Sequence, residues 1–169
     1  MAYRNKTYVA FDGDSDIRYY NLMKAWKQSD KTDFNFYDAH DINNALDTST
    51  EETIKRRLRE RMENSKVFVL LVGDNTKNLR KPYVRYEIEH AISHYKIPII
   101  VVNLNGLRVC DTKLCPPAAR DVLSIHIPYG QKILQYALEN WTNEHYTHVR
   151  NGDSGSYRYK ESVYTSLGL

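Results

Sequence analysis

Three aspartates follow the first apolar stretch of the chain at alternate positions. The segment Asp12-Gly13-Asp14-Ser15-Asp16 comes directly after Thr7-Tyr8-Val9-Ala10-Phe11. Grouped carboxylates can hold a hard divalent cation, and an Asp-x-Asp pair after a first strand is typical of phosphoryl-transfer enzymes. A calcium-binding EF-hand is excluded, because Ile17 stands where that loop requires glycine and Met23 where it requires glutamate. The alternative is that Asp14 to Asp16 cap the helix that follows, near the positive end of its dipole.

A second group with chemical potential lies at the expected start of a helix after the third apolar stretch. The segment runs Arg80-Lys81-Pro82-Tyr83-Val84-Arg85-Tyr86-Glu87-Ile88-Glu89. If Val84 and Ile88 face the core, Tyr83 and Glu87 lie one turn apart on an adjoining face. A carboxylate one turn from an aromatic ring can hold ribose hydroxyls while the aromatic stacks on another ring. The alternative is that Glu87 belongs to the surface ion pairs of the neighbouring charged residues.

Other catalytic and nucleotide-binding signatures do not occur in the sequence. Gly73-Asp74-Asn75-Thr76 stands where a phosphorelay receiver domain places its phosphate-accepting aspartate. The fifth apolar stretch ends in Ile127-Pro128-Tyr129 and lacks the lysine of a receiver, so a turn is the better interpretation of this segment. Glycine-rich phosphate loops and Ser-His-Asp or Cys-His arrangements are also missing.

The two cysteines, Cys110 and Cys115, lie in a polar stretch ahead of Pro116. Structural zinc sites draw their ligands from cysteine pairs and closely spaced histidines. The sequence has no second cysteine pair and no histidine at such spacing. We therefore expect two reduced thiols in a loop and no metal ligands.

Length and composition fit one ordinary domain. The chain has 169 residues, of which 41% are hydrophobic and 27% charged, so it can form a core. Lys and Arg total 24 against 21 Asp and Glu, and the net charge of +3 is low for a dedicated nucleic-acid binder. No apolar run approaches the roughly 20 residues that span a bilayer, and the start lacks a signal-peptide pattern. We expect a cytoplasmic protein without nucleic-acid or membrane partners.

Strand-like and helix-like segments alternate through residues 6–145. Nearly continuous apolar runs predict buried parallel strands, and residues with helical spacing fill the gaps between them. The predicted strands cover residues 7–11, 34–37, 66–72, 97–102 and 124–127. This alternation predicts a three-layer flavodoxin-like α/β fold, with a mainly parallel five-stranded sheet of order 2-1-3-4-5 and helices on both faces. Functional groups in such sheets gather at the carboxyl ends of the strands.

The composition changes near the C-terminus. Residues 151–156 are small and polar, and the residues after them are rich in tyrosine. We expect one domain over residues 1–145 and a tail over residues 146–169 that packs on the domain or on a partner.

Three blocks of the sequence, in order, resemble a known family. The helix opening Tyr83-Val84-Arg85-Tyr86-Glu87 is similar to the region of Toll/interleukin-1 receptor (TIR) domains that contains the catalytic glutamate of NAD-cleaving members. More closely, residues 6–105 resemble the TIR-like ThsB proteins of Thoeris antiphage defence. The resemblance is carried by Tyr8 to Asp16 with Trp26, Phe36 to Ala39 followed by Thr53 to Leu58, and Val69 to Gly73 through Tyr83 to Ile88.

The resemblance implies an enzyme that cleaves the bond between nicotinamide and ribose in NAD. In Thoeris such enzymes respond to a phage-derived trigger and make a cyclic ADP-ribose-type signal, which activates a separate effector protein. NAD is then the substrate, no cofactor is expected, and family practice indicates a homo-oligomer.

The resemblance also assigns roles to residues. Glu87 would contact the ribose hydroxyls and stabilise an oxocarbenium-like transition state. Phe11 and Tyr83 would form walls of the pocket, although Tyr83 stands where the related proteins usually carry tryptophan. Polar contacts to the substrate would come from aspartates after the first and second strands, namely Asp12 and either Asp38 or Asp41.

Two alternatives from other functional classes remain at this stage. The first is a TIR-like interaction module that assembles with partners and has no activity. The second is a magnesium-dependent phosphohydrolase that uses Asp12 and Asp14. Dependence on a divalent metal separates the phosphohydrolase from NAD cleavage, because a carboxylate can assist glycosidic cleavage without a cation.

Overall fold

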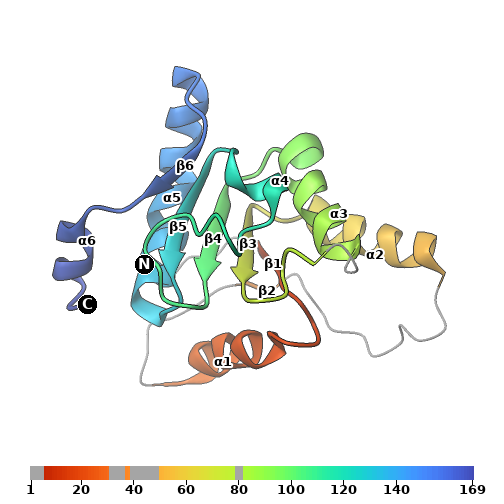
Figure 1. Ribbon diagram of the computed structural model, residues 1–169, viewed down its shortest axis with the longest axis horizontal. Helices are drawn as coiled ribbons and strands as arrows, with labels where there is room; N and C mark the ends of the chain where they lie inside the picture. The colour runs from red at the N-terminus through yellow and green to blue at the C-terminus, as the bar shows by residue number, and fades with distance from the viewer. Residues whose placement is uncertain (1–5, 31–36, 39–49, 79–81) are drawn as a thin grey trace.

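An open parallel sheet with helices on both faces forms the described part of the protein. The computed structural model describes residues 6–30, 37–38, 50–78 and 82–169. Within these ranges, six parallel strands form one sheet of order β2-β1-β3-β4-β5-β6. The strands are β1 Lys6–Ala10, β2 Tyr37–Asp38, β3 Val67–Val72, β4 Ile99–Asn103, β5 Ser124–Pro128 and β6 Ser156–Arg158 (Figure 1). The predicted fold class and the order of the first five strands are confirmed, and β6 adds a strand beyond them.

The central strand β3 shows why the sequence forms this sheet. Its six residues are all buried, because helices cover both of its faces. Alternate side chains point to opposite faces. Val67, Val69 and Leu71 join one core cluster, and Phe68, Leu70 and Val72 join the other. The same alternation in β1 directs Tyr8 and Ala10 to one face, and Val9 to the other.

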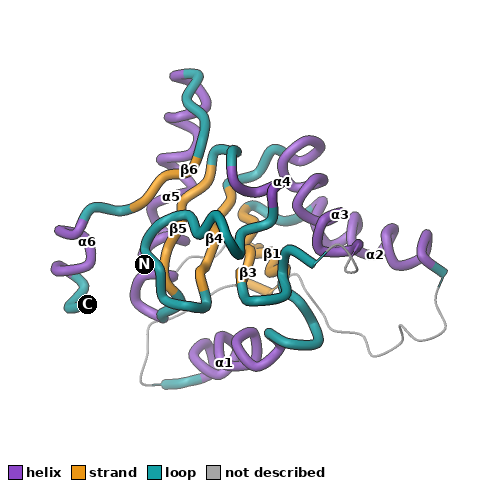
Figure 2. The backbone as a smooth tube through the Cα atoms, in the orientation of Figure 1, coloured by secondary structure: helices purple, strands orange, loops and turns teal. Residues whose placement is uncertain are grey.

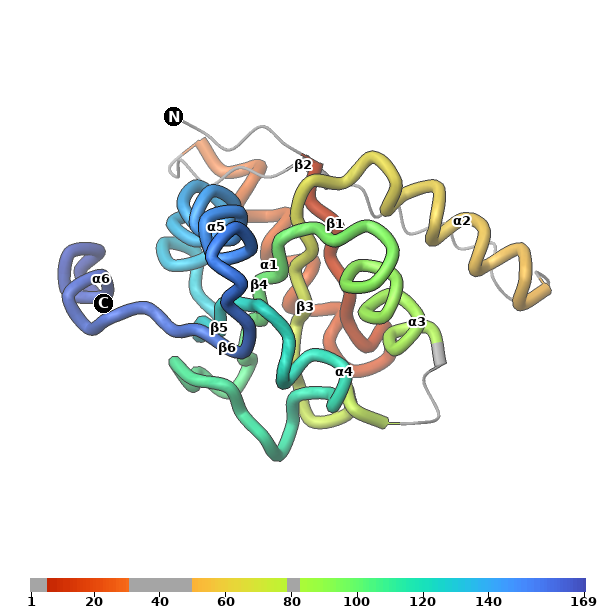
Figure 3. The backbone as a smooth tube through the Cα atoms, turned by 90° about the horizontal axis from the view of Figure 1, so that it is seen from above, coloured from red at the N-terminus to blue at the C-terminus, as the bar shows by residue number. Residues whose placement is uncertain are grey.

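The helices divide between the two faces of the sheet. Helices α1 (Ile17–Gln28) and α5 (Gln131–Asn151) cover one face, and α2 (Glu51–Glu63), α3 (Pro82–His90) and α4 (Pro117–Arg120) cover the other. Figure 2 shows how loops link strand to helix in turn, and Figure 3 shows α5 and α3 on opposite sides of the strands. None of the helices in the described ranges is both long enough and apolar enough to cross a membrane.

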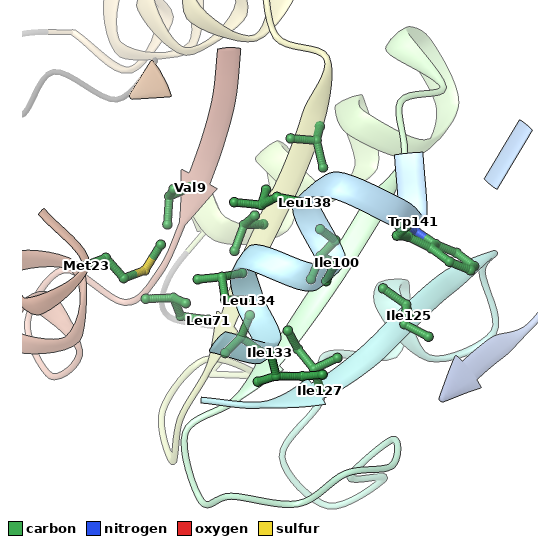
Figure 4. Packing of buried hydrophobic residues seen from close by; sticks show 14 of the residues in the cluster. Val9, Met23, Leu71, Ile100, Ile125, Ile127, Ile133, Leu134, Leu138 and Trp141 are labelled. Carbon is green, nitrogen blue, oxygen red and sulfur yellow. The ribbon is translucent and has the colours of Figure 1, made fainter. Parts of the chain in front are cut away.

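Helix α5 supplies much of the core on its face. Its buried residues recur at helical spacing and pack on β3, β4 and β5 (Figure 4). These residues are Ile133, Leu134, Ala137, Leu138 and Trp141, and His145 is also buried on this helix. Because these side chains are buried and packed together, they hold the strands, and thus their carboxyl ends, in fixed positions.

The start of α2 and the end of α3 each have a distinct local structure. The spacing of Ser49 and Glu52 predicts a capping box, but Ser49 lies outside the described residues and Thr50 is the N-cap of α2. The side chain of Thr50 accepts a hydrogen bond from the backbone N–H of Thr53 at 3.3 Å. Helix α3 continues into a π-helical turn, η2 (Ala91–Tyr95), which ends at Lys96 in the left-handed region with φ 51°.

The segment expected to be a C-terminal tail contributes regular structure. Helix α5 extends past residue 145 to Asn151, β6 pairs with β5, and a short helix α6 (Glu161–Ser166) follows. The Arg108 guanidinium contacts Glu161 at 2.6 Å and lies 4.0 Å from the centre of the Tyr164 ring. These contacts attach α6 to the loop after β4, and Tyr159 and Tyr164 join the core cluster on the α5 face of the sheet.

Candidate functional site

Glu87, the candidate catalytic residue, is buried against β1. Glu87 lies on α3 with only 4% of its surface exposed. The hydroxyl of Tyr8, on β1, donates a hydrogen bond of 2.5 Å to Glu87 Oε1. The Tyr8 ring is fully buried and stacks on Phe68 of β3, with ring centres 5.7 Å apart. The carboxyl group therefore faces β1, and its hydrogen-bond partner Tyr8 is fixed by the core.

Burial raises the pKa of both Glu87 and Tyr8. Removal from water raises the pKa of Glu87 to about 7, although the Tyr8 hydrogen bond and the positive charge of Arg61 act in the opposite direction. The pKa of Tyr8 lies well above its usual 10, because the ring is buried and close to Glu87. Tyr8 thus remains a hydrogen-bond donor at neutral pH, while Glu87 exchanges its proton there. A carboxyl with such a pKa is typical of functional sites.

The two predicted aromatic walls lie on different sides of the sheet. Tyr83 is half-buried and packs on the same core cluster as Tyr8. Phe11 belongs to the opposite cluster and stacks on Tyr20 of α1, with ring centres 4.8 Å apart. The structure therefore brings Tyr83 and Glu87 to one side of the sheet and places the Phe11 ring on the other.

The predicted aspartates fall into three situations. Asp12 is buried and organises its own turn, because its carboxylate accepts hydrogen bonds from the Ser15 hydroxyl at 2.8 Å and the Asp14 backbone N–H at 3.3 Å. Asp38 ends β2 beside Thr7 of β1, which locates its backbone at the sheet edge next to the first strand. Asp41 lies outside the described residues.

The loops that follow β1 and β3 make a close contact at Asp16, Gly73 and Thr76, which we call the Gly73 junction. The Thr76 hydroxyl lies 3.5 Å from Asp16 Oδ2 and accepts a hydrogen bond from the Gly73 backbone N–H at 2.8 Å. Asp16 occupies the N-cap position of α1, but its side chain makes no capping hydrogen bond. The expectation that this carboxylate caps the helix is wrong, because it turns toward Gly73 instead. A side chain at Gly73 would place its Cβ 2.7 Å from both Asp16 carboxylate oxygens.

A pocket of about 590 Å³ lies beside α3. Arg85, Tyr86 and Glu89 contribute to its wall from α3, and Lys55 and Lys77 add positive charge. The remaining lining residues are Thr76, Asn78, Ile88, Pro116, Pro117 and Ala118. Glu87 does not belong to this wall as far as the described residues define it, because its carboxyl group points toward β1. The pocket and the buried carboxyl thus share a helix but occupy different sides of it.

Two features of this region are not evident from the sequence motifs. Tyr8 reads as an ordinary strand residue, and only the packing of α3 across β1 shows that its hydroxyl meets a carboxyl group. His126 of β5 lies with Cys110 and Cys115 in one cluster, although 11 residues separate it from the nearer cysteine. The alternation of β1 could have indicated that Tyr8 and Phe11 face opposite sides, but no local pattern relates His126 to the cysteines.

The fold and a match to a family model together define the class of the protein. The parallel sheet of this order, with helices on both faces, is a flavodoxin-like arrangement and agrees with a TIR-like domain. Residues 8–108 match the family described as Thoeris protein ThsB, TIR-like domain. Because the match spans more than half of the chain, the chain belongs to this family, and its place is among the TIR-like proteins of Thoeris defence.

The Gly73 junction yields a stability prediction. Gly73→Ala should lower the free energy of unfolding by about 1–3 kcal/mol, because the new Cβ forces the Asp16 carboxylate to move. Removing that carboxylate in the double variant Gly73→Ala/Asp16→Ala should recover part of the loss, relative to the sum of the single variants. Urea unfolding measures both effects.

Gly13→Ala is the matched control, since a Cβ at Gly13 meets no atom within 4 Å. Equal stability of Gly73→Ala and the parent chain, or strict additivity in the double variant, would contradict the proposed contact.

Burial of Glu87 also predicts a pH dependence of stability. The folded chain holds the Glu87 proton up to about pH 7, whereas the unfolded chain releases it near the ordinary pKa of 4.5. The folded state binds more protons in this window, so its stability falls as pH rises from 4.5 to 7. Relative to Glu87→Gln, the parent chain should lose on the order of 3 kcal/mol across the window. Glu89→Gln, an exposed variant of the same helix, should follow the parent curve. A pH-independent difference between the parent and Glu87→Gln would refute the prediction.

Proposed function

We propose that the protein cleaves the bond between nicotinamide and ribose in NAD and that Glu87 is the catalytic residue. The observation that supports the proposal is the buried Glu87 carboxyl, held by a hydrogen bond from Tyr8 of β1. Membership of the Thoeris family agrees with this chemistry. Leaving a carboxyl group buried is costly, so its retention in the core favours a chemical role.

The chemistry requires the ionised form of Glu87. When the glycosidic bond breaks, both electrons go to the nicotinamide nitrogen, and the leaving group departs neutral without needing a proton. The ribose carbon becomes cationic, and a nearby carboxylate stabilises this oxocarbenium-like state. Tyr8 engages Oε1, so we assign Oε2 to the ribose hydroxyls. By donating its hydrogen bond, Tyr8 favours the ionised carboxyl and fixes its orientation.

The fate of the ribose carbon decides the product. Attack by a nucleophile within the ADP-ribose part gives a cyclic ADP-ribose-type molecule, whereas attack by water gives ADP-ribose. Exclusion of water from the site favours ring closure. We propose that the cyclic product is the signal that activates a separate effector protein, and that a phage-derived trigger switches on its synthesis in the bacterial cytoplasm. In this proposal NAD is the substrate, no cofactor takes part, and the active form is a homo-oligomer.

A second candidate is a TIR-like interaction module without turnover. The observation that favours it is the burial of Glu87 away from the 590 Å³ pocket, which a structural carboxyl would also show. This candidate predicts self-association without release of nicotinamide. The magnesium phosphohydrolase has less support, because hydrogen bonds within its own turn engage both carboxylate oxygens of Asp12.

The proposal predicts loss of product in a Glu87 variant. Bacteria that express Glu87→Gln should form no new ADP-ribose-type species after phage infection, whereas cells with the parent chain should form it. The amide keeps the size and the hydrogen-bond acceptor for Tyr8 but cannot carry the negative charge. Mass spectrometry of small molecules detects the product and identifies its linkage. Glu89→Gln is the control on the same helix and should retain product formation. Undiminished product in Glu87→Gln would exclude a catalytic role, and absence of product from the parent chain with several phages would favour the interaction module.

Tyr8 should act as a positioning residue with its own signature. Tyr8→Phe removes the hydrogen bond that lowers the pKa of Glu87, so the pKa of Glu87 rises. Because cleavage needs the carboxylate, the rise of activity with pH should move to higher pH and recover in part at alkaline pH. Nicotinamide release in lysates of infected cells, followed from about pH 6 to about pH 9, measures this shift. A uniform loss at every pH would indicate that Tyr8 serves only the fold.

A further inference from the structure

Two cysteines and a histidine meet between the sheet and α4. Cys110 and Cys115 come from the connection between β4 and β5, and His126 lies on β5. One ligand atom from each of the three residues lies within 4.8 Å of the other two. Among the described residues, this is the group of cysteine, histidine and acidic side chains whose spacing could hold a metal ion. It lies apart from the Tyr8–Glu87 pair and takes no part in the proposed reaction.

The hydrogen bonds of His126 leave one ring nitrogen without a partner. His126 is fully buried, and its Nδ1 has no hydrogen-bond partner. Its Nε2 lies 3.2 Å from the Ser124 hydroxyl, which itself donates to the carbonyl of Val122 at 3.1 Å. With the Ser124 proton directed to Val122, we assign Nε2–H as the donor to Ser124, which is the tautomer in which Nδ1 carries a lone pair. A buried lone pair without a donor is costly unless a ligand satisfies it.

The cysteine loop is already held in shape by its own hydrogen bonds. The Asp111 carboxylate accepts bonds from the backbone N–H groups of Lys113 and Leu114 and from the Asn105 side chain, and the Cys115 N–H donates to the Asp111 carbonyl. The two cysteines are thus presented by a preformed turn. Cys115 is fully buried and Cys110 is partly exposed, so solvent can reach the cluster from one side.

We infer that Cys110, Cys115 and His126 bind a zinc ion. Two thiolates and a neutral imidazole are soft and borderline donors of the kind that zinc selects. Their two negative charges neutralise the ion, so the buried site carries no net charge. Binding releases the two thiol protons to solvent, and a water molecule on the Cys110 side completes the tetrahedral coordination. Ser124 then supports the ligand histidine through the other ring nitrogen.

The fold explains what this ion would do. It would link the β4–β5 connection to β5 across residues distant in sequence. Pro116, Pro117 and Ala118 follow Cys115 directly and line the 590 Å³ pocket beside α3. Zinc would therefore fix that wall of the pocket. The spacing in the sequence argues against such a site, because His126 is distant along the chain from the two cysteines. The three residues come together only when the β4–β5 connection folds over the sheet.

Zinc content and affinity of the full chain, purified under reducing conditions, test the inference. The parent chain should hold one zinc ion per chain and compete for Zn²⁺ with a chromophoric chelator. Cys110→Ser, chosen because this residue is partly exposed, should weaken zinc binding about hundredfold or more. X-ray absorption of the zinc form should show two sulfur ligands at about 2.3 Å and a nitrogen ligand at about 2.0 Å. Zinc should raise the melting temperature of the parent chain and not that of Cys110→Ser.

His145→Gln is the matched control, because His145 is also buried with an unpartnered Nδ1 but lies outside the cluster. Its zinc affinity should equal that of the parent chain. Equal zinc affinity of the parent chain and Cys110→Ser would overturn the inference. A Cys110–Cys115 disulfide that persists under reducing conditions would overturn it as well.

Discussion

A carboxyl group buried in a protein core must be protonated or supplied with partners, and Glu87 meets this requirement through one hydrogen bond from Tyr8. The bond ties α3 to β1 across the face of the sheet. Since Tyr8 is itself fixed by stacking on Phe68, the carboxyl group has little freedom. The same burial that constrains Glu87 raises its pKa to about 7, where both protonation states are available. Burial of the Glu87 carboxyl therefore explains both its fixed position and its raised pKa.

Strands β1 and β3, and the loops that follow them, are held in place by the core and by one close contact. Both strands are buried on both faces, so their carboxyl ends are held rigidly beneath the loops that follow. At that end the Asp16 carboxylate fits against the bare backbone of Gly73, which brings the two loops close together. Helix α3 leaves the same edge and presents two different sides. One side carries Glu87 toward β1, and the other borders the basic pocket next to the loop that follows Cys115.

Much of the fold could be predicted from the sequence because long apolar runs leave few alternatives. The run at 67–72 is continuous and apolar, which favours a buried strand. By contrast, β6 is three residues long and mostly exposed, and nothing in its sequence indicates a strand. Helical spacing placed Tyr83 and Glu87 one turn apart on the same side of their helix. It could not show that Tyr8 is the partner, since strand tyrosines commonly pack without such a role. The family resemblance groups Phe11 with the site, yet the two-residue period of the first strand directs its ring to the opposite face.

The most direct test of the central claim is a carbon NMR titration of the Glu87 side-chain carboxyl, with and without ADP-ribose. If Glu87 is the catalytic carboxylate, it should titrate near pH 7 in the free protein, and ADP-ribose should shift both its resonance and its midpoint. A carboxyl that titrates near 4.5, or a resonance that ADP-ribose leaves unchanged, would contradict the assignment of Glu87 to the reacting centre.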